Sequence, residues 1–432
     1  MIKARHIAVM GYDNGSSFYD IKAGDLVIIA RGANWQKECF FAGLAADEAN
    51  FTIEIDNDDP KTARKLVGFV DLKGVEVPFT TECTGGESTN PHRACCRLHP
   101  ENSADAKVIE KVLSIVLLKI KEESMRNWID LILASHNVIL TGAPGTGKTY
   151  TAQEVAKALI LGAESVGKKL SAAQEKQLKS RLCTIQFHPG YDYSDFVIGM
   201  KPVLLNDKGK EVQEGERCSV SFKWKKGEFV RFAELAASDG DNKYVMVIDE
   251  INRADLSRVF GELFSRIEPD YRGEEHAIDL PNGEKFYVPS NLYIIGTMND
   301  IDRSVDSMDF ALRRRFAWKE VTAEESMRII DAKVTDAELA ERLKGVMCEI
   351  NQYLGGNKKV SLDGRELALG LGPEYQLGGA IFANATKYGN EEAMSKVWQN
   401  HVRVILSEYL RGNKDKNGIL KVFAKEFGVS ED

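Results

Sequence analysis

The stretch from Gly142 to Thr149 reads GAPGTGKT, and it lies between the apolar run NVIL and the run KTYTAQEVAKALIL, which is rich in helix formers. A strand, a glycine-rich turn and a helix in this order predict a phosphate-binding loop. The glycines let backbone N–H groups wrap the phosphates, Lys148 supplies a cation to the outer phosphates, and the Thr149 hydroxyl can hold Mg²⁺. A chance glycine-rich turn is the weaker alternative, because the full pattern occurs in its expected context. The predicted triphosphate site comprises Gly142, Ala143, Pro144, Gly145, Thr146, Gly147, Lys148, Thr149 and Tyr150.

Two adjacent acids end a second apolar run, YVMVIDEIN, which spans residues 244–252. Asp249 at the carboxyl end of a strand is suited to the Mg²⁺ shell, together with Thr149. Glu250 is suited to polarise a water for attack on the γ-phosphate. A solvated acidic turn is the simpler alternative. Once a phosphate loop is present, the pair favours hydrolysis of the nucleotide over binding alone.

A third apolar run, LYIIGTM, leads into the polar stretch NDIDRSVD. If this strand lies beside the other two, Asn299 can hydrogen-bond the attacking water or the phosphate. Further on, ALRRRF places Arg313, Arg314 and Arg315 consecutively inside a predicted helix. Three consecutive side chains cannot share one helix face, so at least one is free to point at a neighbouring subunit. An arginine donated across a subunit boundary can raise hydrolysis by roughly 10³ to 10⁵, which predicts an enzyme that is active as a ring.

The elements that must position these residues alternate between strands and helices over residues 137–320. Buried strands with helices between them predict an α/β fold with a parallel sheet, interrupted by hairpin insertions near 203–228 and 273–288. Residues 1–105 contain short β-prone runs and predict a small barrel or sandwich, and 106–136 predict linking helices. Residues 321–432 predict a helical lid domain.

Composition narrows the class of protein. The 432 residues carry a formal charge of −8, so the whole molecule lacks the field of a non-specific nucleic-acid binder, and any DNA contact must be local. Seven scattered cysteines do not suggest a disulfide framework in a chain of this size. We find no signal-peptide pattern and no apolar run long enough for a membrane span, and we expect a cytoplasmic protein without membrane contact.

The chemistry-bearing segments resemble those of the AAA+ ATPases. More specifically, IQFHPGYDYSDFVIGMKP, IDEINRADLSRVFGELFSRIEPDYRG and IIGTMNDIDRSVDSMDFALRRRF resemble the McrB family, the motor subunits of modification-dependent restriction systems. The resemblance covers roughly residues 137–320, with weaker echoes in the lid and none in the first hundred residues. It implies a homo-hexameric ring, hydrolysis of GTP and a separate McrC-like endonuclease as partner.

The resemblance also implies roles for particular residues. Arg314 corresponds to the trans-acting finger and Arg315 to a second sensor. Asp302 and Arg303 are implied to organise the catalytic water. The family pattern MNTADRS is altered here, because Asp300 and Ile301 replace Thr and Ala. GTP is favoured on family grounds alone, and ATP stays open, because no guanine-reading motif is visible.

The first hundred residues are the region where restriction motors of this type read their target. Residues 1–110 contain 12 Lys and Arg against 17 Asp and Glu, so phosphate neutralisation is not the main source of affinity there. A pocket for one flipped, modified DNA base is compatible with this charge. GDLVIIARGANWQKECFFAGLA faintly resembles the EVE or PUA-like modified-base readers, and a protein-binding role is the alternative. The aromatic candidates, most of which are expected in the core, are Tyr12, Phe18, Tyr19, Trp35, Phe40 and Phe41.

A zinc site in the segment CTGGESTNPHRACCRLH is a minor hypothesis. The candidate ligands are Cys83, His92, Cys95, Cys96 and His99. Adjacent cysteines do not easily share a tetrahedral site, so a polar loop with buried thiols is preferred. EPDYRG followed by NGEKF superficially suggests a nuclease centre, but its position between the second and third strands favours a hairpin.

A protein-remodelling ATPase of the MoxR type is the alternative function. It uses the same ring to pull on a protein client and does not touch DNA. A partner nuclease encoded beside this chain would favour restriction, and a client enzyme would favour remodelling.

Overall fold

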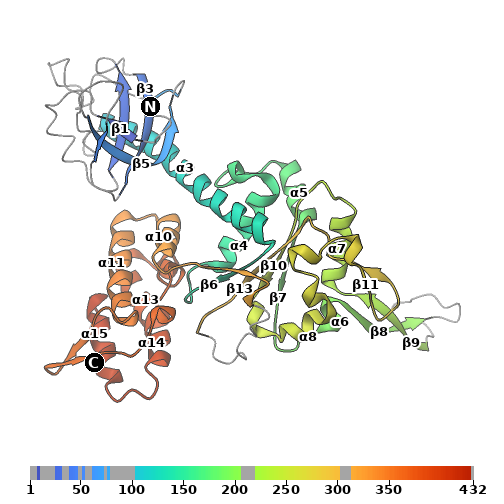
Figure 1. Ribbon diagram of the computed structural model, residues 1–432. Coiled ribbons are helices and arrows are strands. Elements are labelled where there is room, and N and C mark those ends of the chain that lie inside the picture. The colour runs from blue at the N-terminus through green and yellow to red at the C-terminus, as the bar shows by residue number, and fades with distance from the viewer. Residues whose placement is uncertain are drawn as a thin grey trace. The chain divides into compact units, whose positions relative to one another are not determined.

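The computed structural model divides into two compact units, Met1–Trp128 with Ala163–Lys169, and Ile129–Gly162 with Leu170–Asp432 (Figure 1). The long helix α3 (Ser103–Ser135) belongs to both, because its residues from Ile129 onward are part of the second unit. The structure describes residues 7–9, 25–31, 38–46, 51–53, 61–72, 75–77, 103–205, 219–301 and 313–429.

The first unit is β-rich, as predicted. Its strands are β1 (Ile7–Val9), β2 (Leu26–Arg31), β3 (Glu38–Ala45), β4 (Phe51–Ile53) and β5 (Lys61–Asp71). They form one antiparallel sheet in the order β1-β5-β3-β2, and β4 also pairs with β5. Buried Ala42 and Leu72 of this unit pack against Val108, Val112 and Val116 of α3. The sheet is therefore covered by the apolar stripe at the start of that helix.

The aromatic candidates of the first unit are only partly described. The Phe41 ring stacks on Phe69 with centroids 5.1 Å apart, which is a packing contact within the unit. Tyr12, Phe18, Tyr19 and Trp35 lie outside the described residues, and the side chain of Phe40 is not described. The zinc candidates Cys83, His92, Cys95, Cys96 and His99 also lie outside them.

The second unit is built on a five-stranded parallel sheet in the order β14-β6-β13-β10-β7. Its strands are β6 (Asn137–Thr141), β7 (Leu182–Gln186), β10 (Tyr244–Asp249), β13 (Leu292–Thr297) and β14 (Ala317–Glu320). All six residues of β13 are buried, which explains the continuous apolar run in the sequence. The α/β fold predicted from the sequence is confirmed. All its strands point the same way, so their carboxyl ends meet at one edge.

Helices and two hairpins connect the strands of this sheet. The helices are α4 (Lys148–Leu161), α5 (Ala172–Arg181), α6 (Tyr193–Phe196), α7 (Glu228–Ala237) and α8 (Leu256–Phe260). The predicted insertions are antiparallel hairpins, β8 (Ile198–Leu205) with β9 (Ser219–Lys226), and β11 (Ile278–Asp279) with β12 (Lys285–Phe286). The second pair is the hairpin that we preferred over a nuclease centre.

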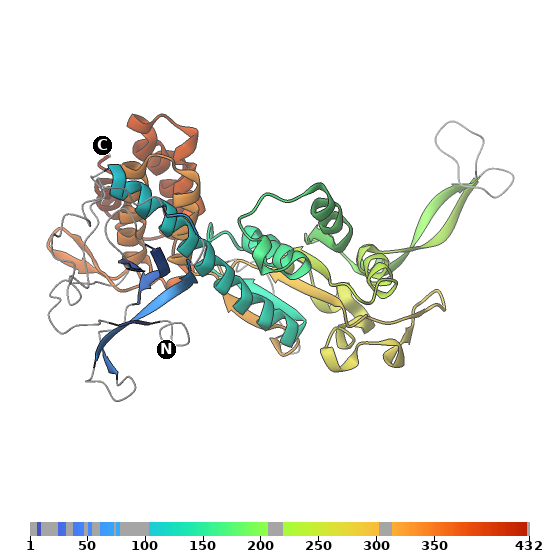
Figure 2. The same ribbon diagram turned by 90° about the horizontal axis from the view of Figure 1, so that it is seen from above.

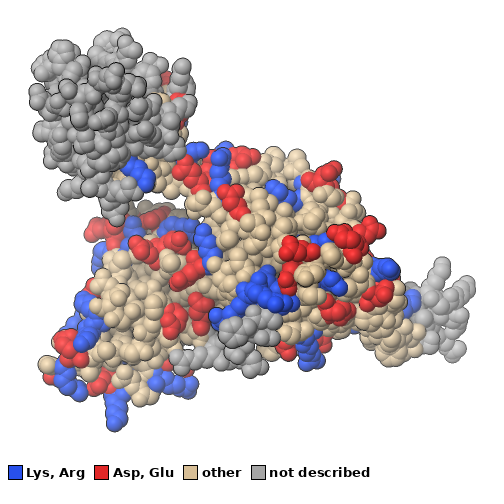
Figure 3. Space-filling model, in the orientation of Figure 1, with Lys and Arg blue, Asp and Glu red and all other residues tan. Residues whose placement is uncertain are grey.

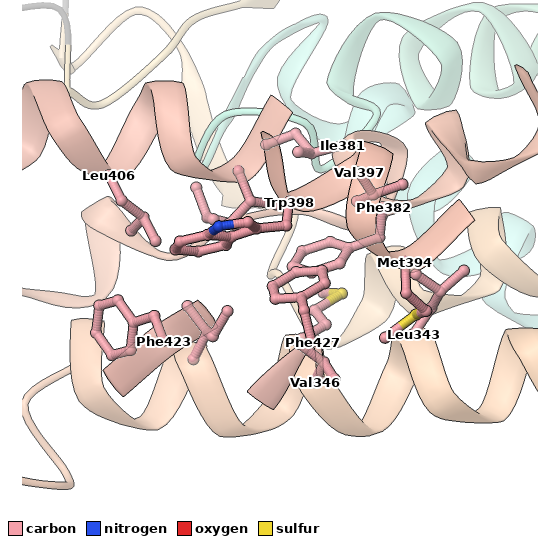
Figure 4. Packing of buried hydrophobic residues seen from close by; sticks show 14 of the residues in the cluster. Leu343, Val346, Ile381, Phe382, Met394, Val397, Trp398, Leu406, Phe423 and Phe427 are labelled. Atoms are coloured by element: carbon pink, nitrogen blue, oxygen red, sulfur yellow. The ribbon is translucent and has the colours of Figure 1, made fainter. Parts of the chain in front are cut away.

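The chain from about 321 onward is mostly helical. It contains α10 (Arg328–Lys333), α11 (Ala337–Leu354), α12 (Gly379–Phe382), α13 (Asn390–Val397), α14 (Arg403–Tyr409) and α15 (Lys416–Glu426), with one small hairpin, β15 (Val360–Leu362) and β16 (Arg365–Leu367). Its core forms around fully buried Trp398, which packs against Phe427, and Phe427 in turn stacks on Phe382 (Figure 4). This core shares no residue with the cluster around the sheet. The region is therefore a lid with its own hydrophobic interior. Among the described helices, none has the length and apolar character that crossing a membrane requires.

Candidate nucleotide-hydrolysis site

The predicted phosphate-binding loop follows β6 and ends at Thr149, the second residue of α4. Gly142, Gly145 and Gly147 have φ values of 139°, 78° and 81°, a region that favours glycine, so the loop's path depends on them. Lys148 is buried, and its Nζ donates to the backbone oxygens of Gly142 and Ala143, each at 2.9 Å. The amine is therefore held within the loop that it is expected to serve. Tyr150 is exposed on the first turn of α4.

Asp249, Thr149 and Thr297 meet at the carboxyl edge of the sheet. Asp249 Oδ1 accepts hydrogen bonds from Thr149 Oγ1 at 2.7 Å and from Thr297 Oγ1 at 2.5 Å. Magnesium in phosphate-transfer sites usually has one or two protein oxygen ligands and completes its shell with water and phosphate. A hydroxyl and a carboxylate at hydrogen-bond distance beside the phosphate loop fit that donor set. Thr149 and Asp249 would hold Mg²⁺, which would neutralise charge on the phosphates.

Glu250 has an unusual backbone conformation, with φ 51° and ψ 46°. A non-glycine residue in this left-handed region is uncommon and typical of functional sites. Its Oε1 accepts a hydrogen bond from Asn299 Nδ2 at 2.9 Å, and its Oε2 lies 3.3 Å from Arg253 Nε. The backbone N–H of Glu250 donates to Thr297 Oγ1 at 3.3 Å. The structure thus brings Glu250 and Asn299 together across the adjacent strands β10 and β13.

Asp300 lies against the phosphate loop. Its carboxylate accepts a hydrogen bond from the Gly142 backbone N–H and faces Lys148, and Glu320 and Glu374 are also close enough to affect it. Burial raises the pKa of Asp300. The negative charges of Glu320 and Glu374 also raise it, whereas the positive charge of Lys148 lowers it. The residue that departs from the family pattern is therefore a charged neighbour of the predicted phosphate site.

The lid contacts the phosphate loop directly. The backbone N–H of Gly378 donates to Pro144 O at 2.8 Å, and that of Ala380 donates to Gly145 O at 3.0 Å. A Cβ on Gly378 would stand 2.1 Å from Gly145 C. Arg328 Nη2 of the lid donates to Thr151 Oγ1 on α4 at 3.0 Å. The lid therefore hydrogen-bonds to two backbone carbonyls of the phosphate loop, those of Pro144 and Gly145.

The predicted arginines lie at the other end of the sheet. Arg315 is mostly buried, with Nε 2.8 Å from Glu268 Oε1 and its guanidinium over the Phe264 ring at 4.3 Å. The backbone oxygen of Arg315 accepts a hydrogen bond from Asn137, the first residue of β6, whereas the phosphate loop follows the last. Arg314 is exposed and lies 3.7 Å from Glu268.

This placement separates the candidate residues into two groups. Glu250, Asn299 and the loop residues share the carboxyl edge of the sheet, and the arginines do not reach it within this protomer. The second-sensor role that the resemblance implies for Arg315 gains no support from its position. Asp302 and Arg303 lie outside the described residues.

Sequence reasoning missed several groups at the site. Thr297 ends the third strand, but its buried hydroxyl serves Asp249 and Glu250, which are distant in sequence. Arg253 was visible as the arginine of INR directly after the two acids. Gly378 was visible only as part of a glycine pair in the lid, with no local signal for its contact with the loop.

Comparison with known proteins places this site in a family. Residues 137–316 match the AAA domain (dynein-related subfamily). The chain is 30% identical over 321 residues to the Type IV methyl-directed restriction enzyme EcoKMcrB subunit of Escherichia coli K12, a match that covers 72% of this chain and 61% of that protein. It is 26% identical over 330 residues to the Type II restriction enzyme BsuMI component YdiS of Bacillus subtilis 168, covering 69% of this chain and 87% of that protein.

The segment that matches the AAA domain ends at Phe316, directly after the three arginines. It contains the phosphate loop, the paired acids and Asn299. The domain match and the relatives agree with the geometry at the carboxyl edge of the sheet. This chain therefore contains an AAA domain over residues 137–316, is similar to the EcoKMcrB subunit and to the BsuMI component, and spans 61% of the length of the first of these relatives.

Proposed function

We propose that this chain is the ring-forming motor subunit of a restriction system, hydrolysing GTP, with ATP as the alternative, to move DNA for a separate McrC-like endonuclease. The relatives support this proposal, because one is named as a subunit of a methyl-directed restriction enzyme and the other as a component of a restriction enzyme. A homo-hexameric ring is the assembly proposed. The β-rich module of residues 1–105, with its resemblance to EVE or PUA-like readers, is proposed to read modified DNA.

In the hydrolysis step, Glu250 is the group that accepts a proton from the attacking water. Its carboxylate is held at one oxygen by Asn299, so the attacking water is expected beside this pair, within reach of both side chains. Lys148 moves from the loop carbonyls to the phosphate oxygens. Thr149 and Asp249 would hold Mg²⁺, which would neutralise charge on the phosphates. Each of these groups comes from the carboxyl edge of one protomer's sheet.

The observation that carries the ring is the position of Arg314. Its side chain is 69% exposed and starts from the end of the sheet that lies away from its own phosphate loop. A guanidinium there is available to the loop of an adjacent protomer, where it would stabilise charge on the transferred phosphate. In this proposal Arg315 supports the finger by holding Glu268 beneath it. Arg328, which reaches Thr151 from the lid, is the candidate for a sensor that acts within the protomer.

A mixing experiment tests the shared site. Arg314→Ala retains Glu250 as the base for its own site but has no arginine finger to donate to its neighbour. Glu250→Gln retains the arginine finger but has no base in its own site. Each variant alone is expected to hydrolyse GTP or ATP at least about 10²-fold more slowly than wild type. A mixture regains turnover at interfaces where each protomer supplies what the other lacks. A mixture of Arg314→Ala with the double variant is the control, and it should stay inactive.

Recovery in the first mixture only would support a site shared between protomers. If Arg314→Ala alone kept full turnover, or if wild type at strictly monomeric dilution were as active as the assembled form, the ring proposal would be wrong. Turnover measured separately with GTP and ATP, with and without the partner nuclease, decides the nucleotide. Binding of the full chain to methylated and unmodified duplexes tests the reading role of the first unit.

A further inference from the structure

The hairpin of β8 and β9 extends away from helices α6 and α7 of its own unit (Figures 1 and 2). Its base is fixed to the core. The backbone N–H of Gly227 donates to Val197 O at 2.7 Å, and a Cβ on Gly227 would stand 2.3 Å from Phe196 C. Phe196 is fully buried and stacks on Phe229 with centroids 4.9 Å apart. The hairpin is thus a two-stranded ribbon held firmly at one end.

One face of this ribbon is apolar and exposed. The register pairs three rungs of side chains on that face: Met200 with Trp224, Pro202 with Phe222, and Leu204 with Val220. Phe222 is 63% exposed and Trp224 is 43% exposed, and Met200 and Val220 are exposed as well. In Figure 3 the surface at this end of the unit is mostly uncharged. Contiguous exposed apolar side chains of this kind mark a binding surface.

The charge of the ribbon is positive. Its two strands contain four lysines and no acidic residue, in a chain with a formal charge of −8. Lys201 and Lys226 form ion pairs with carboxylates near the base, and Lys223 and Lys225 are exposed farther along β9. Lysines also protect ribbon edges from pairing with other strands. That role accounts for the charges but leaves the exposed aromatic rings without an explanation.

We propose that this ribbon binds unpaired bases of a DNA strand, with Phe222 and Trp224 as stacking platforms. Lys223 and Lys225 alternate with these rings along β9, so they lie on the opposite face and add positive charge to the ribbon without contacting the stacked bases. Residues two apart on one strand face are about 6.6 to 6.8 Å apart, which is roughly twice the 3.4 Å spacing of stacked bases, so one base fits between the rings. Stacking on aromatic side chains with lysines nearby is how sequence-independent single-strand sites work. The inference rests on the proposed action on DNA and adds a second contact, in the motor unit itself.

Fluorescence anisotropy of a labelled oligothymidylate with the full chain tests this site. Phe222→Ala and Trp224→Ala are each expected to weaken binding roughly 5- to 150-fold. Lys223→Ala with Lys225→Ala is expected to weaken binding less than either aromatic substitution and to make binding less sensitive to salt. Leu235→Ala, which removes an exposed apolar side chain from α7, is the matched control and should bind as wild type. Basal NTP turnover should be unchanged in all of them, because the ribbon does not form the hydrolysis site.

Three results would overturn the inference. The first is wild-type protein that binds no oligothymidylate, and the second is an aromatic variant that binds it as tightly as wild type. The third is a variant that keeps DNA binding but loses self-assembly by light scattering or loses the nuclease partner, which would make the apolar face a protein contact. None of these results affects the mixing experiment, so the ring proposal is tested separately.

Discussion

The substitution Gly378→Ala is predicted to push the lid away from the phosphate loop. Gly378 has φ −83° and ψ 158°, which alanine adopts without strain, so only space is at stake. The added Cβ would stand 2.1 Å from Gly145 C and 2.2 Å from Thr146 N, both backbone atoms that cannot rotate away. The two segments must separate by more than about 1 Å to reach ordinary carbon contact distances. That movement would break the hydrogen bonds from Gly378 to Pro144 and from Ala380 to Gly145.

The magnitude follows from these contacts. Two lost hydrogen bonds at about 0.5 to 1.5 kcal/mol each and overpacking of about 1 to 3 kcal/mol disfavour the seated lid by about 2 to 6 kcal/mol. The ratio of seated to unseated lids should fall about thirtyfold or more, and kcat/KM for nucleotide hydrolysis by a factor of that order. The control is Gly389→Ala, since Gly389 also precedes a lid helix with an extended backbone but has no atom within 4 Å of its Cβ position.

Steady-state turnover and binding of a fluorescent triphosphate, with thermal unfolding as a check on folding, measure the effect. We expect Gly389→Ala to match wild type in all three. The reasoning is refuted if Gly378→Ala hydrolyses nucleotide with unchanged kcat/KM, because the lid would then not need its place on the loop. A loss of folding in Gly378→Ala alone would instead assign the contact to stability.

Three further predictions concern the carboxyl edge of the sheet. Glu250→Gln should bind triphosphate with near wild-type affinity and lose about 10²- to 10⁴-fold in turnover, measured by phosphate release; turnover above a tenth of wild type would exclude it as the base. Valine has nearly the shape of threonine, so Thr297→Val removes only the buried hydroxyl, at a cost of about 1 to 3 kcal/mol. The Mg²⁺ concentration for half-maximal turnover should therefore rise at least about fivefold, and an unchanged Mg²⁺ titration would contradict the role of Thr297. Asp300→Asn should tighten triphosphate binding about three- to tenfold because it removes a negative charge that faces Lys148. Glu320→Gln is its control and should have a smaller effect; weaker binding in Asp300→Asn would mean that the carboxylate assists the nucleotide.

Much of the site could be predicted from the sequence, because its signals are local. The phosphate loop is a run of eight residues whose glycines and lysine act on one ligand, and the paired acids directly end a buried strand. The apolar runs of β10 and β13 predicted a parallel sheet, and parallel strands bring their ends to one edge. That rule led us to expect Asn299 at the same edge of the sheet as the phosphate loop. One predicted segment boundary does not coincide with an element boundary, because α3 (Ser103–Ser135) runs continuously through the position between residues 105 and 106.

The sequence by itself determined the fold class, the phosphate loop and the acids, because each depends on residue types within a short window. Only the tertiary structure decided that Glu250 takes a left-handed backbone, that Gly378 rests against Gly145, and that Arg315 lies at the amino end of β6. The physical reason is that these features involve contacts between segments from 47 to more than 230 residues apart. Such contacts are set by how the sheet and lid pack, and a pattern read along one chain segment does not contain that information.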